Sequence, residues 1–97
     1  MTAYVISEVE IVDAEAGAQY RELAAASIAK YGGRYLARGA QAQVVEGEPT
    51  SRRMVVVEFP SMDRVREWYG SAEYALALKF RGRALRRRLM FVEGMPG

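Results

Sequence analysis

The sequence contains no cysteine and no histidine among its 97 residues. The absence of cysteine excludes disulfide bonds, thiolate metal sites and cysteine nucleophiles. The absence of histidine excludes imidazole metal ligands and every catalytic triad whose general base is an imidazole. Lysine is scarce as well, because only Lys30 and Lys79 among the 14 basic residues are lysine. Any proton transfer therefore falls to carboxylates, tyrosine phenols or lysine.

The chain also lacks long apolar runs. Glu8 and Glu10 interrupt the apolar N-terminal stretch, and no uncharged stretch approaches the ~20 residues that a membrane span requires. We therefore expect a cytoplasmic protein without membrane insertion. A length of 97 residues and a hydrophobic fraction of 51% predict one globular domain, residues 1–97.

Charge is distributed unevenly along the chain. Residues 1–33 contain five acidic and two basic residues, whereas residues 64–88 contain eight basic and two acidic residues. The basic part could attract nucleic acid, an anionic ligand or the acidic part of a second copy. Phe80, Ala84 and Leu85 interleave the arginines of residues 81–88. This pattern predicts an amphipathic helix with a solvated side, and it does not favour nucleic-acid binding.

The apolar periodicity alternates between that of strands and that of helices. Strands are predicted at 3–12, 34–46 with a bulge near Gly39, 53–59 and 89–93, and helices at 14–31, 62–69 and 72–87. Asp13, Ser61 and Ser71 are the expected helix N-caps, and Gly32-Gly33 is the expected end of the first helix. The order predicts an α+β fold, the ferredoxin-like βαββαβ arrangement. Its four-stranded antiparallel sheet has the first and third strands in the centre and the helices on one face.

Both faces of the predicted sheet are apolar. In the segment RMVVVEF, Met54 and Val56 point to one face, whereas Val55, Val57 and Phe59 point to the other. The helices cover one face, and no further part of this short chain is left for the second. Burial of that face against a second copy predicts a homodimer.

Glu58 and two arginines are candidate site residues. Glu58 lies within an apolar strand, where burial would raise its pKa and suit it to proton transfer, but a structural ion pair with an arginine is also expected there. Even spacing predicts that Arg34 and Arg38 share one strand face, where two guanidinium groups would bind an anion. A charged edge strand that resists aggregation is the alternative.

Three aromatic residues, Trp68, Tyr69 and Tyr74, flank the predicted helix break at Gly70. They would line a ligand pocket or anchor the core. No carboxylate cluster has metal-site spacing, and no glycine-rich loop precedes a helix, so we expect no metal ion and no cofactor.

These features together resemble a known family, the domain-of-unknown-function family 1330. The resemblance covers nearly the whole chain and rests on the opening Ala3-Tyr-Val-Ile6, Tyr31-Gly-Gly-Arg-Tyr-Leu-Ala-Arg-Gly39, Val45-Glu-Gly47, Glu58-Phe-Pro-Ser61, Trp68-Tyr69 with Ser71 and Tyr74, and Val92-Glu-Gly94. It implies the dimeric α/β-barrel superfamily, in which two ferredoxin-like sheets face each other. That superfamily includes cofactor-free monooxygenases, muconolactone-isomerase-like proteins and haem-degrading enzymes. Many family members have a histidine where this chain has Tyr31, and the absence of histidine argues against haem ligation.

Two functions follow as expectations. In the first, a pocket between sheet and helices binds or converts a small anionic metabolite, as an isomerase or a cofactor-free monooxygenase would. Arg34 and Arg38 would hold the anion, Glu58 or a tyrosine would move a proton, and Trp68, Tyr69 and Tyr74 would form the apolar wall. In the second, the protein is a non-catalytic ligand sensor or a structural dimer module.

Overall fold

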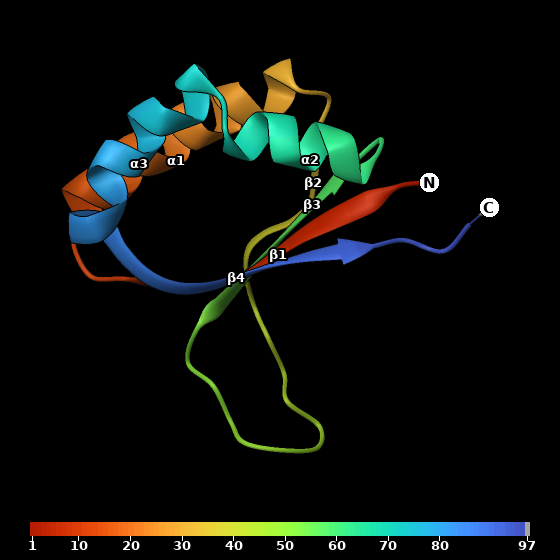
Figure 1. Ribbon diagram of the computed structural model, residues 1–97. Helices are drawn as coiled ribbons and strands as arrows, with labels where there is room; N and C mark the ends of the chain where they lie inside the picture. Colours follow the sequence, from red (N-terminus) through yellow and green to blue (C-terminus); the bar gives the residue numbers. More distant parts are fainter. Residues whose placement is uncertain (97) are drawn as a thin grey trace.

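Helices cover one face of a four-stranded sheet in the computed structural model, which describes residues 1–96 (Figure 1). The elements are β1 (Ala3–Ile11), α1 (Ala14–Lys30), β2 (Arg34–Gln41), β3 (Arg53–Phe59), α2 (Met62–Tyr69), α3 (Ala72–Ala84) and β4 (Leu85–Glu93). The strands are ordered β2-β3-β1-β4, and all neighbouring pairs are antiparallel. The predicted α+β class, the ferredoxin-like order and the two central strands are confirmed. No helix within residues 1–96 is long and apolar enough to cross a membrane.

The three predicted caps begin the three helices. The Asp13 carboxylate accepts a hydrogen bond from the Ala16 backbone amide at 3.0 Å, and the Ser71 hydroxyl accepts one from the Tyr74 amide at 3.0 Å. Ser61 caps α2 in the same way at 3.2 Å. After α1, Gly32 adopts a φ of +85°, a conformation that glycine reaches without steric cost. Short polar side chains and one glycine therefore set the helix boundaries.

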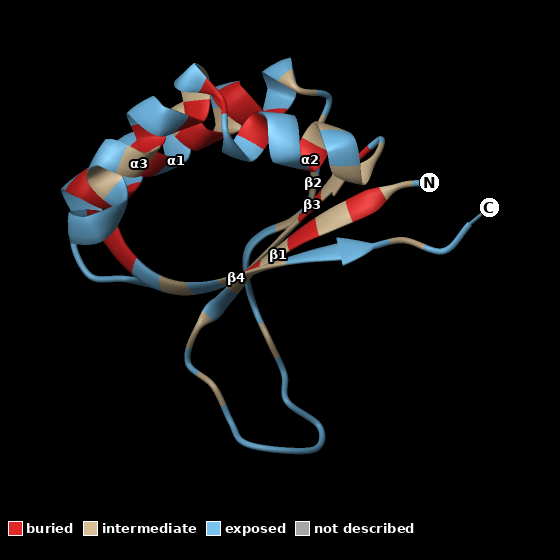
Figure 2. Cartoon of the chain, in the orientation of Figure 1, coloured by how far each residue is buried: buried red, intermediate tan, exposed pale blue. Residues whose placement is uncertain are grey.

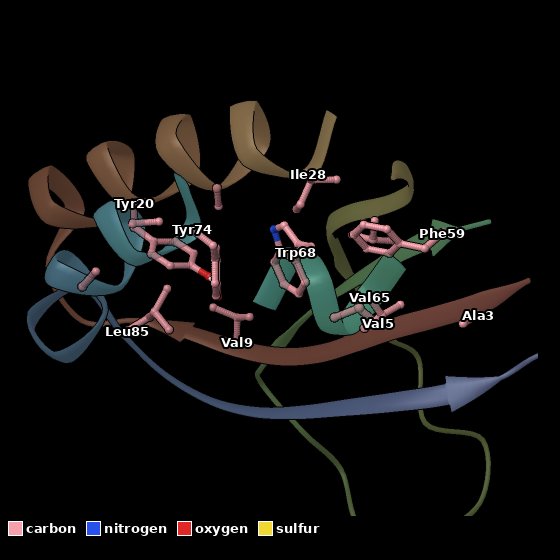
Figure 3. Close-up of a cluster of buried hydrophobic side chains, with 14 of the residues drawn as sticks. Ala3, Val5, Val9, Tyr20, Ile28, Phe59, Val65, Trp68, Tyr74 and Leu85 are labelled. Atoms are coloured by element: carbon pink, nitrogen blue, oxygen red, sulfur yellow. The ribbon is translucent and has the colours of Figure 1, made fainter. Parts of the chain in front are cut away.

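The core lies between the helices and the sheet (Figures 2 and 3). From Ala3 to Val9 of β1, the residues that face the helices are buried and those that face away are half-buried. Phe59, Trp68 and Tyr74 are at most 2% exposed. Their rings pack one against the next in tilted pairs. The ring centroids of Phe59 and Trp68 are 5.5 Å apart, and those of Trp68 and Tyr74 are 4.3 Å apart. This series of aromatic contacts joins β3 to α2 and α2 to α3, and it thus fixes both helices on the sheet.

Within residues 1–96, no helix covers the opposite face of the sheet, which we call the open face. The strand register brings together apolar side chains from three strands on it: Tyr4, Ile6, Met54, Val56, Met90 and Val92. The segment between β2 and β3 extends away from the helices on this side (Figure 1). The predicted division of strand residues between two apolar faces is confirmed.

The second strand ends earlier than predicted, at Gln41 and not at residue 46. Its pairing with β3 shifts register twice, between Tyr35 and Ala37 and between Arg38 and Ala40. The second shift is the predicted bulge, where Gly39 has a φ of +75°. The first shift, at Leu36, was not predicted. Each shift exchanges the faces to which the following side chains point.

The last strand begins earlier than predicted, because α3 ends at Ala84 and β4 starts at Leu85. The prediction of a helix through residue 87 was therefore wrong. Arg86 and Arg88 pair with Glu10 and Glu8 of β1 in the antiparallel ladder. Opposite charges on facing strands favour the extended conformation over a continued helix.

Candidate functional site

A cavity of about 950 Å³ lies between α1 and the helix-covered face of the sheet. Its apolar wall is formed by Trp68 of α2 and by strand residues that include Val5, Val9, Val55, Val57 and Leu89. This volume and this apolar lining are typical of small-molecule sites in proteins.

The charged residues around the cavity are predominantly basic. Arg21, Arg38, Arg53 and Arg87 line it, together with a single acidic residue, Glu22. Within residues 1–96, none of these five side chains lies within 4.0 Å of an oppositely charged group. Four guanidinium groups without carboxylate partners give the cavity a positive potential.

Arg38 lies where β2 and α1 approach each other. Its guanidinium group lies 4.7 Å from the centre of the Tyr35 ring, and its Nη2 donates to the Arg21 carbonyl oxygen at 3.5 Å. Burial raises the pKa of Tyr35, and the positive charge of Arg38 only partly opposes this shift. Tyr35 therefore remains a protonated hydrogen-bond donor at neutral pH.

Arg87 links two phenols at one end of the cavity. Its Nη1 donates to the Tyr20 hydroxyl at 2.5 Å and its Nη2 donates to the Tyr74 hydroxyl at 2.7 Å, while the two hydroxyls lie 2.6 Å apart. Figure 3 shows the Tyr20 and Tyr74 rings between the helices and β1. Burial is the main cause that raises the pKa of Tyr20, and the proximity of the Tyr74 phenol is the second. Two phenol groups and one guanidinium group thus join α1, α3 and β4.

Ser7 is the one polar residue of β1 that is buried on the cavity side, at 4% exposed. Its Oγ has no hydrogen-bond partner among the residues that the structure describes. Other buried polar side chains are paired. The Trp68 indole nitrogen, for example, donates to the Ser27 hydroxyl at 3.0 Å, and Ser27 donates to the Ala24 carbonyl at 2.7 Å.

The structure separates the six residues predicted to form the site. Arg34 pairs with Glu58 on the open face, with Nε 3.0 Å from Oε1, whereas Arg38 faces the cavity. The prediction that the two arginines share a face was wrong, because the extra residue at Leu36 reverses the alternation between them. Glu58, the predicted proton-transfer group, lies on the open face with Arg34 and does not line the cavity.

The three aromatic candidates are also separated. Trp68 lines the cavity, and Tyr74 is fully buried with its hydroxyl on Arg87. Tyr69 is 43% exposed and packs edge-on against Phe91, with ring centroids 5.5 Å apart. Of the predicted site residues, Arg38 and Trp68 thus line the cavity directly.

Tyr31 lies at the junction of α1 and α3. Its hydroxyl donates to Glu73 Oε1 at 2.9 Å, and Lys30 forms an ion pair with the same carboxylate. The hydrogen bond from Lys30 is the main cause that lowers the pKa of Glu73 to about 2. Tyr31 is therefore engaged in a surface network with Glu73 and Lys30.

Sequence reasoning missed Ser7, Tyr20 and Arg87 as site residues. Tyr20 was assigned no role in the site, and Arg87 was placed among the arginines of a partly solvated helix. The alternation along β1 already placed Ser7 between the buried residues Val5 and Val9, which was the available signal. Within residues 1–96, no group of three or more acidic side chains could hold a metal ion.

The fold and the cavity define a ferredoxin-like α+β protein with a basic-lined cavity under its helices. The chain belongs to the family described as domain of unknown function DUF1330, whose model matches residues 2–95. A search of curated proteins finds no match.

Solved structures share the fold. The RPA0582 protein of Rhodopseudomonas palustris, of unknown function, superposes with a TM-score of 0.79 at 20% identity, over 99% of this chain and 84% of that one. SnoaB, a cofactor-independent oxygenase of Streptomyces nogalater, superposes with a TM-score of 0.69 at 8% identity, over 99% of this chain and 95% of that one. A dimeric protein of unknown function from Bacteroides fragilis, with a ferredoxin-like fold, superposes with a TM-score of 0.58 at 13% identity, over 96% of each chain.

Proposed function

We propose that this protein binds a small amphipathic anion in the cavity between α1 and the sheet. The charge imbalance of the cavity carries the proposal, because its four arginines face a single carboxylate, Glu22, and have no ion-pair partner within residues 1–96. An apolar body would pack against Trp68 and the strand valines. Its anionic group would lie at Arg38 and Arg53, which are exposed at the edge of the cavity. Guanidinium groups bind carboxylates and phosphates through charge-assisted hydrogen bonds.

Calorimetric titration with naphthoate and with neutral naphthalenemethanol tests the proposal. We expect naphthoate to bind about tenfold more tightly than the alcohol. The affinity for naphthoate should decrease as salt is added. Equal affinities for the two compounds, or no binding of either, would contradict an anion-binding cavity.

Conversion of the bound anion is a second candidate, supported by the likeness of the fold to the cofactor-independent oxygenase SnoaB. In a monooxygenation without cofactor, the substrate supplies the electrons, one oxygen atom of O₂ enters the product and the other leaves as water. An isomerisation requires only a proton transfer. Glu22, an exposed residue that lines the cavity, would be the carboxylate that accepts the proton, since Glu58 lies on the open face.

Oxygen uptake separates these reactions. Consumption of O₂ by the protein with an ionised phenolic acid, lost in the Glu22→Gln variant, would support oxygenation. Binding without turnover of any phenolic acid would leave the non-catalytic ligand sensor as the function.

We also propose that two copies associate through their open faces. The apolar side chains on that face, including Ile6, Val56 and Met90, support this arrangement, and one protein of the same fold is dimeric. Burial of such a face at ~25 cal/mol per Å² contributes several kcal/mol.

Sedimentation of the wild-type protein at micromolar concentration should show twice the chain mass of 10.8 kDa. The Val56→Arg variant should sediment as a monomer, because it places a charge in the centre of the interface. A wild-type protein that sediments only as the monomer would contradict the homodimer.

A further inference from the structure

Ser7 is the unexplained polar group of the cavity. It lies in the central strand β1, is 4% exposed, and its Oγ has no hydrogen-bond partner within residues 1–96. A buried hydroxyl without a partner is unfavourable, and native proteins seldom retain one without a reason.

The sheet register explains why the protein itself offers no partner. On the helix-covered face, Ser7 stands opposite Val55 of β3 and Leu89 of β4. Val5 and Val9 flank it along β1, and Figure 3 shows both on the side of the strand that faces the helices. All four neighbours are aliphatic, so the only direction left for a hydrogen bond is into the cavity.

The same row of the sheet contains Arg38. The row runs from Arg38 in β2 through Val55 to Ser7, so two strand spacings, on the order of 10 Å, separate the two polar residues. Between them lies apolar surface. A ligand that satisfies both ends therefore carries an anionic group, a rigid apolar body and a second polar group at its far end.

We propose that Ser7 is a ligand-binding residue, which hydrogen-bonds a hydroxyl or carbonyl group on the apolar body of the bound anion. The ligand class is thus a hydroxy- or oxo-substituted aromatic-sized acid, with its charged end at Arg38. This inference rests on the proposed function, and it adds a determinant of specificity that the arginines alone do not provide.

The test compares two probes on wild-type protein and on Ser7→Ala. The probes are naphthoate and the hydroxynaphthoate whose hydroxyl and carboxylate occupy opposite ends of the two rings. In the wild type, the added hydroxyl should increase affinity about tenfold, the size of one well-placed hydrogen bond. In Ser7→Ala, the two probes should bind with equal affinity, near that of naphthoate for the wild type.

Thermal unfolding without ligand distinguishes binding from a structural role. Ser7→Ala should match or exceed the wild-type Tm, because it removes an unpaired hydroxyl. The control Ser27→Ala, at an equally buried serine that accepts the Trp68 hydrogen bond, should lower the Tm without changing the preference between the probes.

Three outcomes would overturn the inference. A hydroxyl preference that survives in Ser7→Ala, or no preference in the wild type, would remove Ser7 from the site while the anion-binding function stands. A loss of Tm in Ser7→Ala equal to that in Ser27→Ala would make Ser7 a structural residue. Failure of naphthoate itself to bind would remove the proposed function and this inference together.

Discussion

Arg34 and Arg38 lie four residues apart on β2, yet their side chains point to opposite faces of the sheet. Arg34 pairs with Glu58 on the open face, and Arg38 reaches over the Tyr35 ring at the cavity. The extra residue at Leu36 produces this reversal. One strand thereby supplies an arginine to each of two surfaces, the cavity and the proposed dimer interface.

The two arginines provide a matched pair of variants. Arg38→Gln should lower the affinity for naphthoate about tenfold, because a charge-assisted contact at the cavity is lost. Arg34→Gln, the same substitution on the other face, should leave that affinity within about twofold. Calorimetric titration of both variants measures the difference, and equal losses would show that Arg38 has no special part in binding.

The Tyr20 hydroxyl should contribute to stability. Tyr20→Phe removes an acceptor from the half-buried guanidinium group of Arg87 and a partner from the Tyr74 hydroxyl, so the free energy of unfolding should fall by about 1–3 kcal/mol. Tyr31→Phe, which removes a hydroxyl at the surface network with Glu73, should lower it clearly less. Urea denaturation of both variants checks this order, and a reversed order would contradict it.

Alkaline pH should unfold the protein through Tyr20. Burial raises the pKa of Tyr20 in the folded protein above the ordinary value of 10.0, so the unfolded chain loses this proton first. The resulting stability is complete below pH 10 and decreases as the pH rises further. Tyr20→Phe should make the free energy of unfolding less steeply dependent on pH above 10, as followed by urea titrations at each pH. An unchanged dependence would mean that Tyr20 ionises freely in the folded state.

Acidic pH should weaken the contact between α1 and α3. The Lys30 hydrogen bond is the main cause that lowers the pKa of Glu73 from 4.5 to about 2, so the stability that this carboxylate adds is present above pH 4.5. It is lost as the pH falls toward 2, because the carboxylate becomes protonated. In thermal melts, the Tm of Glu73→Gln should be slightly below that of the wild type at neutral pH, and the two should be equal at pH 2. A deficit that is constant with pH would contradict the ion pair as its cause.

The fold was predictable from local patterns, and the site was predictable only in part. The caps at Asp13, Ser61 and Ser71 and the two apolar strand faces depend on short-range spacing, which the sequence displays. The register shift at Leu36 has no local marker, because neither glycine nor proline stands there. The strand at Leu85 depends on pairing with acidic residues of β1, more than seventy positions earlier. Arg38 lines the cavity because of the shift at Leu36, and Arg87 lines it because Leu85 begins a strand, so neither position followed from local sequence patterns.

The place of β1 in the sheet also constrains how the chain acquires its structure. Among the four strands, β1 is synthesised first, and it pairs along its full length with β4, which is synthesised last. Until residues 85–93 emerge, one edge of β1 has no strand partner, and the Tyr20 and Tyr74 hydroxyls lack the guanidinium group of Arg87. The nascent chain therefore completes the core of this domain only after residues 85–93 have been synthesised, and a chain truncated before Leu85 exposes an apolar strand edge prone to aggregation.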